Sequence, residues 1–196
     1  AVAGWNALYK NSGSLSLASA VASEVARLVT LDMKSEVSGS ERADFINDGY
    51  KRVVADCRKT CELACSSGGI VFKPYVKDAK IAVDYIRAEN FVPYEFDESG
   101  NITGAAFLDR CNDGKKVYTK IEKHSMKDGF YTIENKVFLS NSDSCFGKSV
   151  PLSSVDAWRG LSEKVKMTGI NRPLFAYFSM PMANCIDPAS PLGVSV

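Results

Sequence analysis

The spacing of apolar residues changes at Ser66-Ser67-Gly68-Gly69, and this change constrains the fold more than any other feature. Before it, apolar residues recur at steps of three and four, as in amphipathic helices. After it, apolar and polar residues alternate, as in half-buried strands. The pattern predicts an α+β fold, with two N-terminal helices, the second long, packed on an antiparallel β-sheet or meander. The helical part is 1–68 and the β-rich part 69–196, together one domain.

Two stretches of the helical part carry the helical spacing. The first predicted helix spans residues 14–32, and the second spans 39–66, which corresponds to about 40 Å. Ser38 and Glu41 have the spacing of a capping box for the second helix. Gly68 is expected to end it, because glycine adopts the left-handed conformation found at helix ends.

The β-rich part is expected to form an antiparallel meander. Asp113-Gly114 and Asp128-Gly129 lie between β-rich runs, and Asp-Gly is a strong signal for a tight hairpin turn. Residues 139–163 are polar and predict a loop with one short helix near 154–161. The predicted strands are 70–73, 80–85, 102–111, 116–124, 129–138 and 174–178.

Composition and charge are those of an ordinary globular domain. Apolar residues make up 45% and charged residues 24% of the 196 residues. With 24 basic and 23 acidic side chains the net charge is +1, whereas dedicated nucleic-acid-binding domains carry a basic excess. Local charged patches remain compatible with this balance. No apolar run reaches the roughly 18 residues of a membrane span, and no signal peptide is recognisable.

Gly147-Lys148-Ser149 matches the end of a phosphate-binding P-loop. The motif also needs a glycine five residues before Gly147, and Ser142 stands there. Pro151 follows where a helix should already have started. These departures favour a plain polar loop.

The chain has six cysteines, with no sequence sign of secretion. Free thiols in a reducing, intracellular environment are therefore expected. Cys57, Cys61 and Cys65 are spaced by four on the second helix and are interpreted as core residues. A zinc site would need paired ligands at closer spacing and two further ligands. The other three are Cys111, Cys145 and Cys185.

A Cys–His nucleophile would have to use His124, the only histidine. Its place at the end of a predicted hairpin strand favours an exposed, unreactive side chain. No cysteine lies in a recognisable protease signature.

The remaining polar residues give no candidate site. Asp84, Asp97 and Glu98 are expected in surface and turn positions, and no acidic residue is expected in apolar surroundings that would shift its pKa. Trp5 and Trp158 are expected to fill the core. We therefore assign no catalytic, cofactor-binding or metal-binding residue and expect no enzymatic activity. The charged residues expected to be exposed are Lys73, Arg87, Arg110 and Lys148.

The order of segments resembles portal proteins from tailed phages and prophages of Gram-positive hosts. In that family a glycine-ended helix passes to a strand of the form G-x-x-x-[KR]-P, here Gly69 to Pro74. The block NRPLFAYFSMPMANCIDPASPLGVSV is also similar to the family. A run of the form F-x-P-x-x-[FY]-D-x-x-G-x-I-x-x-A is met by Phe91, Pro93, Phe96, Asp97, Gly100, Ile102 and Ala105.

The resemblance implies the wing region of a portal, truncated before the stem helix. Such proteins form a dodecameric ring at one capsid vertex, the head–tail connector of the virion, which is assembled in the host cytoplasm. The ring supports DNA packaging and genome ejection. Its implied partners are its own copies, capsid and scaffolding proteins, terminase, head–tail connector proteins and the phage DNA that passes through it, but no membrane. The alternative is an unrelated soluble structural or protein-binding α+β module without catalysis.

Overall fold

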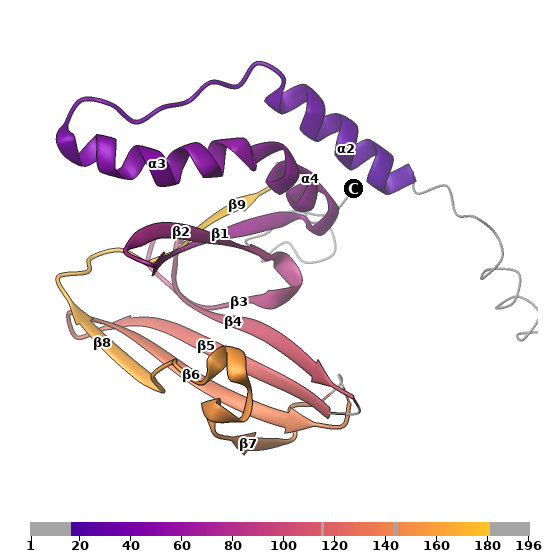
Figure 1. Cartoon of the computed structure of the whole chain (residues 1–196), viewed down its shortest axis with the longest axis vertical. Helices are drawn as coiled ribbons and strands as arrows, with labels where there is room; N and C mark the ends of the chain where they lie inside the picture. The colour runs from indigo at the N-terminus through magenta and orange to yellow at the C-terminus, as the bar shows by residue number, and fades with distance from the viewer. Residues whose placement is uncertain (1–16, 115, 143–144, 181–196) are drawn as a thin grey trace, which may run out of the picture.

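The computed structural model describes residues 17–114, 116–142 and 145–180. Figure 1 shows a helical layer, a three-stranded sheet beneath it and a six-stranded sheet below that. The α+β class is therefore confirmed. The helices are α2 (Leu17–Thr30), α3 (Glu41–Ala55) and α4 (Cys57–Ser67). The strands are β1 (Gly69–Lys77), β2 (Lys80–Arg87), β3 (Phe91–Phe96), β4 (Ile102–Asp113), β5 (Lys116–Lys127), β6 (Phe130–Ser140), β7 (Lys148–Val150), β8 (Lys164–Thr168) and β9 (Ala176–Ser179).

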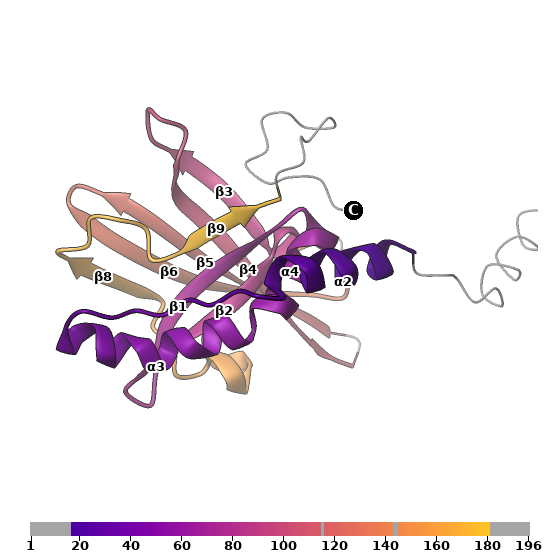
Figure 2. The same cartoon turned by 90° about the horizontal axis from the view of Figure 1, so that it is seen from above.

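The prediction of one long second helix is wrong, because the chain breaks at Asp56 into α3 and α4. The Asp56 backbone N–H points to the carbonyl oxygens of both Arg52 and Val54, and the helix axis turns there. The Tyr85 hydroxyl lies 3.3 Å from the Asp56 carboxylate and holds the break against β2. The break lets α3 lie along β2 while α4 packs on α2 and β1 (Figure 2).

The predicted helix ends are partly confirmed. Ser40, not Ser38, caps α3, and its hydroxyl accepts a hydrogen bond from the Ala43 N–H at 3.2 Å. The helix begins two residues later than the predicted capping box requires. Gly68 ends α4 in the left-handed conformation, at φ 79°, as the sequence predicts.

The three-stranded sheet has the order β2-β1-β9, so its third strand comes from the far end of the chain. Residues 174–178 were expected to be the last strand, and β9 occupies most of this range. It pairs antiparallel with β1, from Gly69 opposite Ser179 to Phe72 opposite Ala176. The last strand thus joins the sheet under the helices instead of continuing the meander.

The six-stranded sheet contains the predicted meander. Its order is β3-β4-β5-β6-β7, and β8 also pairs with β6. Asp128 and Gly129 turn between β5 and β6 with φ values of 53° and 75°, as expected for a tight Asp-Gly hairpin. Gly114 has φ 60° in the preceding hairpin. β3, β7 and β8 are strands that the sequence patterns did not single out, and β7 lies in the segment 139–163 that was predicted to be a loop.

Two apolar clusters fix these layers. Between the sheets, Phe107 of β4 lies against Phe91 of β3 and Phe175 of the segment before β9, with ring centroids 5.6 and 5.5 Å apart. The second cluster contains Trp158, which is buried as predicted. Leu152, Val155 and Trp158 of this cluster come from a segment expected to be a polar loop with one short helix, and Val137 comes from β6. The segment contains two short 3₁₀ turns, Leu152–Ser154 and Asp156–Trp158.

We predict that Gly147→Ala destabilises the fold, because Gly147 has φ +66° and an added Cβ would lie 2.1 Å from the Leu139 carbonyl oxygen. Left-handed strain and this clash together should lower the free energy of unfolding by about 3 kcal/mol. Gly114→Ala is the matched control, since φ there is +60° but nothing lies within 4 Å. Its cost should be about 1 kcal/mol, so equal losses in urea denaturation would contradict the prediction.

Candidate functional site

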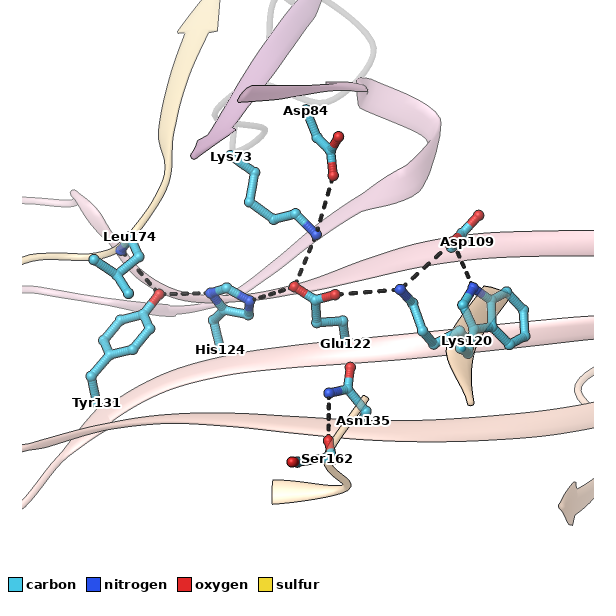
Figure 3. A network of polar contacts seen from close by, with 11 residues as sticks. Lys73, Asp84, Asp109, Lys120, Glu122, His124, Tyr131, Asn135, Ser162 and Leu174 are labelled. Atoms are coloured by element: carbon cyan, nitrogen blue, oxygen red, sulfur yellow. Dashed lines mark hydrogen bonds and ion pairs between the residues drawn. The ribbon is translucent and has the colours of Figure 1, made fainter. Parts of the chain in front are cut away.

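A buried ion pair joins the two sheets. Lys73 of β1 and Glu122 of β5 approach to 2.9 Å between Nζ and Oε1, and the Glu122 side chain is 14% exposed (Figure 3). The other carboxylate oxygen of Glu122 lies 3.5 Å from Lys120 Nζ. Asp84 lies at the rim, 4.0 Å from Lys73 Nζ. Because the two main partners belong to different sheets, this contact fixes how one sheet lies on the other.

A chain of hydrogen bonds continues from Glu122 through His124 to the segment before β9. The distances are 2.9 Å from Glu122 Oε1 to His124 Nε2, 2.7 Å from His124 Nδ1 to the Tyr131 hydroxyl, and 3.0 Å from that hydroxyl to the Leu174 N–H. The Leu174 N–H donates to the hydroxyl oxygen, so the hydroxyl proton is directed at Nδ1. The pattern is complete when His124 is neutral and donates from Nε2 to the carboxylate.

At the other end of Glu122, Lys120 extends the network towards the second apolar cluster. Lys120 Nζ lies 3.6 Å from Asp109 Oδ2 and 5.6 Å from the ring centroid of Trp158. The Trp158 indole N–H donates to Asp109 at 3.1 Å. Beside Glu122 on the same face, the Asn135 amide N–H donates to the Ser162 carbonyl oxygen at 2.9 Å. The inner face of the six-stranded sheet thus carries a continuous polar line between two apolar clusters.

The electrostatics of this line stabilise its charged form. Burial would raise the pKa of Glu122, but the hydrogen bond from His124 and the positive charges of Lys73 and Lys120 outweigh it. Together they hold the pKa of that carboxyl far below its usual range. Burial raises the pKa of Tyr131 to about 12, so its hydroxyl stays protonated.

The network borders a cleft of about 340 Å³ between the sheets, lined by Lys73, Lys120 and Glu122 among others. Both ring nitrogens of His124 are already hydrogen-bonded within the protein. Both oxygens of Glu122 face cations or His124. This arrangement holds its protons and charges in place, and its direct chemical effect is to lock two sheets together.

Three expectations about these residues are wrong. His124 is 2% exposed instead of a surface residue, because β5 continues to Lys127 and places it mid-strand, facing Phe107. Glu122 is an acidic residue with a strongly shifted pKa, where none was expected. Lys73 is largely buried instead of exposed. The missed signal is the alternation of polar residues at Lys120, Glu122 and His124, which places all three on the buried face of one strand.

The prediction that Cys57, Cys61 and Cys65 are core residues is confirmed in part. Cys65 is buried, Cys57 and Cys61 are half-buried, and none of the described cysteines is in a disulfide, while Cys185 lies outside the described residues. Burial raises the pKa of the Cys57 and Cys61 thiols, which keeps them protonated. Within residues 17–114, 116–142 and 145–180, no group of three or more His, Cys, Asp or Glu is arranged to hold a metal ion.

The other sequence candidates lie apart from the network. Gly147-Lys148-Ser149 leads into β7, which pairs with β6, and no helix starts there. Asp97 forms the β3–β4 turn by accepting hydrogen bonds from the N–H groups of Ser99 and Asn101. The Trp5 expected in the core lies outside the described residues. The residues confirmed as exposed are Arg87, Glu98, Arg110 and Lys148.

Compared with models of known protein families and with curated proteins, the chain matches none of them. In the part of the chain that the structure describes, no helix combines the length and apolar character needed to cross a membrane.

We predict that Glu122→Gln lowers the free energy of unfolding by roughly 3–5 kcal/mol at pH 7, because Lys73 and Lys120 would stay buried without their counter-charge. Asp84→Asn is the control: this carboxylate is half-exposed and 4.0 Å from Lys73, so its loss should cost less than about 0.5 kcal/mol. Urea unfolding of the three proteins measures both effects. Comparable losses would show that Glu122 does not anchor the sheets.

The same variant has a predicted pH signature. The folded-state pKa of Glu122 is depressed, so its stabilising effect is fully present above the unfolded value of about 4.3 and is lost as the pH falls further. The difference in unfolding free energy between wild type and Glu122→Gln should stay constant from pH 7 to 5 and narrow below about pH 4. A difference that persists unchanged at pH 3 would contradict this linkage.

Proposed function

We propose that the chain is a structural part of a phage portal ring, corresponding to its wing region, and that it has no catalytic role. The observation that carries this proposal is the place in the fold of the motif that runs from Phe91 to Ala105 and resembles portal proteins. Its positions fall on the β3–β4 hairpin, where Phe91, Ile102 and Ala105 are buried in the core between the sheets. Gly100 adopts φ 80° in the turn. The motif therefore encodes a hairpin that supports the core.

The helical layer supports a role in assembly. Large apolar side chains project from it into solvent, including Leu28, 58% exposed, and Phe45, 65% exposed. Leu17 and Leu31 are similarly exposed. Exposed apolar surface is typical of protein contacts where such side chains adjoin. In a ring each subunit presents two different faces to its neighbours, and the helical layer would supply one of them.

The same surface also favours a second candidate, a protein-binding α+β module unrelated to portals. Both candidates use the helical layer as a contact surface. They differ in the assembly they form, because only a portal closes into a ring with many copies of one chain.

The test is the mass and symmetry of the full-length parent protein, measured by negative-stain microscopy and light scattering. Rings of about a dozen subunits with a central hole are the expected result for a closed heterologous assembly. A monodisperse monomer or dimer at every salt concentration would refute the portal proposal and leave the binding module.

A variant pair tests the helical layer within that assembly. Leu28→Ser with Phe45→Ser should reduce the fraction of full-length protein in rings several-fold, because both side chains are exposed and would lose only intersubunit contacts. Val76→Ser, at an equally exposed position near the end of β1, is the control. Loss of rings with both variants, or with neither, would exclude the helical layer as a specific ring contact.

The chain of 196 residues should itself be monomeric. A wing region alone lacks the stem and crown surfaces that provide much of a portal ring interface. Light scattering should give the mass of one chain, and a stable ring formed by this chain alone would contradict the expectation.

A further inference from the structure

The six-stranded sheet has one face that the rest of the described fold leaves open. Residues directly opposite each other on neighbouring strands point to the same face, and successive residues alternate. Phe107 and Glu122 are one such pair, and they face the three-stranded sheet. The next row, Leu108, Ile121 and Lys136, therefore faces the other way. The helices lie beyond the three-stranded sheet, far from this open face (Figure 1).

The open face is strongly basic. The pairing register places two carboxylates on it, Glu95 and Glu134, and each is already paired, Glu95 with Lys127 at 2.9 Å and Glu134 with Lys164. Four further cations on the face have no carboxylate within 4.0 Å among the described residues, and they come from four different strands. They are Arg110 of β4, Lys123 of β5, Lys136 of β6 and Lys166 of β8.

Aromatic rings lie among these cations. Lys123 Nζ is 4.5 Å from the ring centroid of Tyr94, and Lys166 Nζ is 5.6 Å from that of Phe130. The Phe130 ring is 40% exposed. Phe138 also belongs to this face, and the exposed Phe146 ring lies 5.7 Å from it. The face thus offers flat apolar rings and unpaired positive charges side by side.

We propose that this open face binds single-stranded nucleic acid, with the four cations contacting phosphates and the exposed rings stacking on bases. Cations spread across neighbouring strands suit a polyanion that runs over the sheet, and exposed rings suit unpaired bases. An acidic peptide would use the charges but leave the rings without a role. A duplex keeps its bases stacked inside and would do the same.

The near-neutral net charge of +1 is compatible with this basic face. It averages the basic sheet face with acidic side chains elsewhere, such as Glu24, Glu62 and Asp97. The inference does not rest on the proposed portal function, since a chain that forms no rings could still bind nucleic acid through this face.

Fluorescence anisotropy with a labelled oligothymidine of about 15 nucleotides tests the proposal. Four phosphate contacts predict that log K falls with log salt at a slope of about −2.8, so affinity should drop roughly 50-fold between 50 and 200 mM salt. The same titration is run with a duplex of equal length and with an acidic polyglutamate peptide.

The decisive variant removes the four unpaired cations of the open face as Arg110→Gln, Lys123→Gln, Lys136→Gln and Lys166→Gln. The matched control removes four exposed cations of the helical part as Lys34→Gln, Arg42→Gln, Lys51→Gln and Lys59→Gln. Both variants change the net charge equally, and circular dichroism checks that both fold. The first should lose at least about tenfold in affinity for oligothymidine, and the control less than about twofold.

Several outcomes would overturn the proposal. They are equal loss with both variants, no binding at 50 mM salt, tighter binding to duplex, and binding to polyglutamate but not to oligothymidine. The last result would assign the face to an acidic protein partner. None of these outcomes bears on whether the full-length protein forms rings.

Discussion

The arrangement of the two sheets depends on the ion pairs that the Glu122 carboxylate forms. The carboxylate pairs with Lys73 of the three-stranded sheet and with Lys120 of its own strand, and it accepts a hydrogen bond from His124. A single buried lysine would be costly, since desolvation of an unpaired charge exceeds most packing gains. Grouping the charges around one carboxylate offsets that cost and fixes a single orientation, because an ion pair with hydrogen bonds tolerates less sliding than apolar contacts alone. The Phe107 ring lies against both Lys73 and His124, and this apolar neighbour strengthens their contacts.

Local sequence patterns predicted most helices and strands. Long-range packing determined the break at Asp56 and the buried polar network. The Asp-Gly turns, the glycine-ended helix and the strands of the meander were accessible because each depends on residues close in sequence. The break at Asp56 was not, since an unbroken helical stripe crosses it and the cause is the packing of α3 and α4 on different partners. The network was missed for a related reason. Lys120, Glu122 and His124 look like the polar side of a surface strand until Lys73, Phe107 and Phe175 are placed against them.

The two faces of the six-stranded sheet differ in how their charged side chains are paired. The inner face holds its charges in balanced pairs around the buried Lys73, Lys120 and Glu122 side chains, with Asp109 at the exposed end. The outer face carries two ion pairs and four further cations that have no carboxylate within 4.0 Å among the described residues. The helical layer adds a third kind of surface, apolar and exposed. A subunit of an assembly needs a rigid interior and dissimilar surfaces. In this fold the inner sheet face, the outer sheet face and the helical layer lie in separate places.

The pairing of β9 with β1 has a consequence for how the chain folds during synthesis. Most of the meander forms between neighbours in sequence, so it can fold as soon as those strands leave the ribosome. The sheet under the helices is incomplete until residues 176–179 emerge, more than one hundred positions after the β1 residues with which they pair. Until then β1 has a free edge and the helical layer rests on a two-stranded hairpin, which is marginally stable alone. The pairing of β9 therefore acts as a late closing step, and the nascent chain is most vulnerable to aggregation just before it.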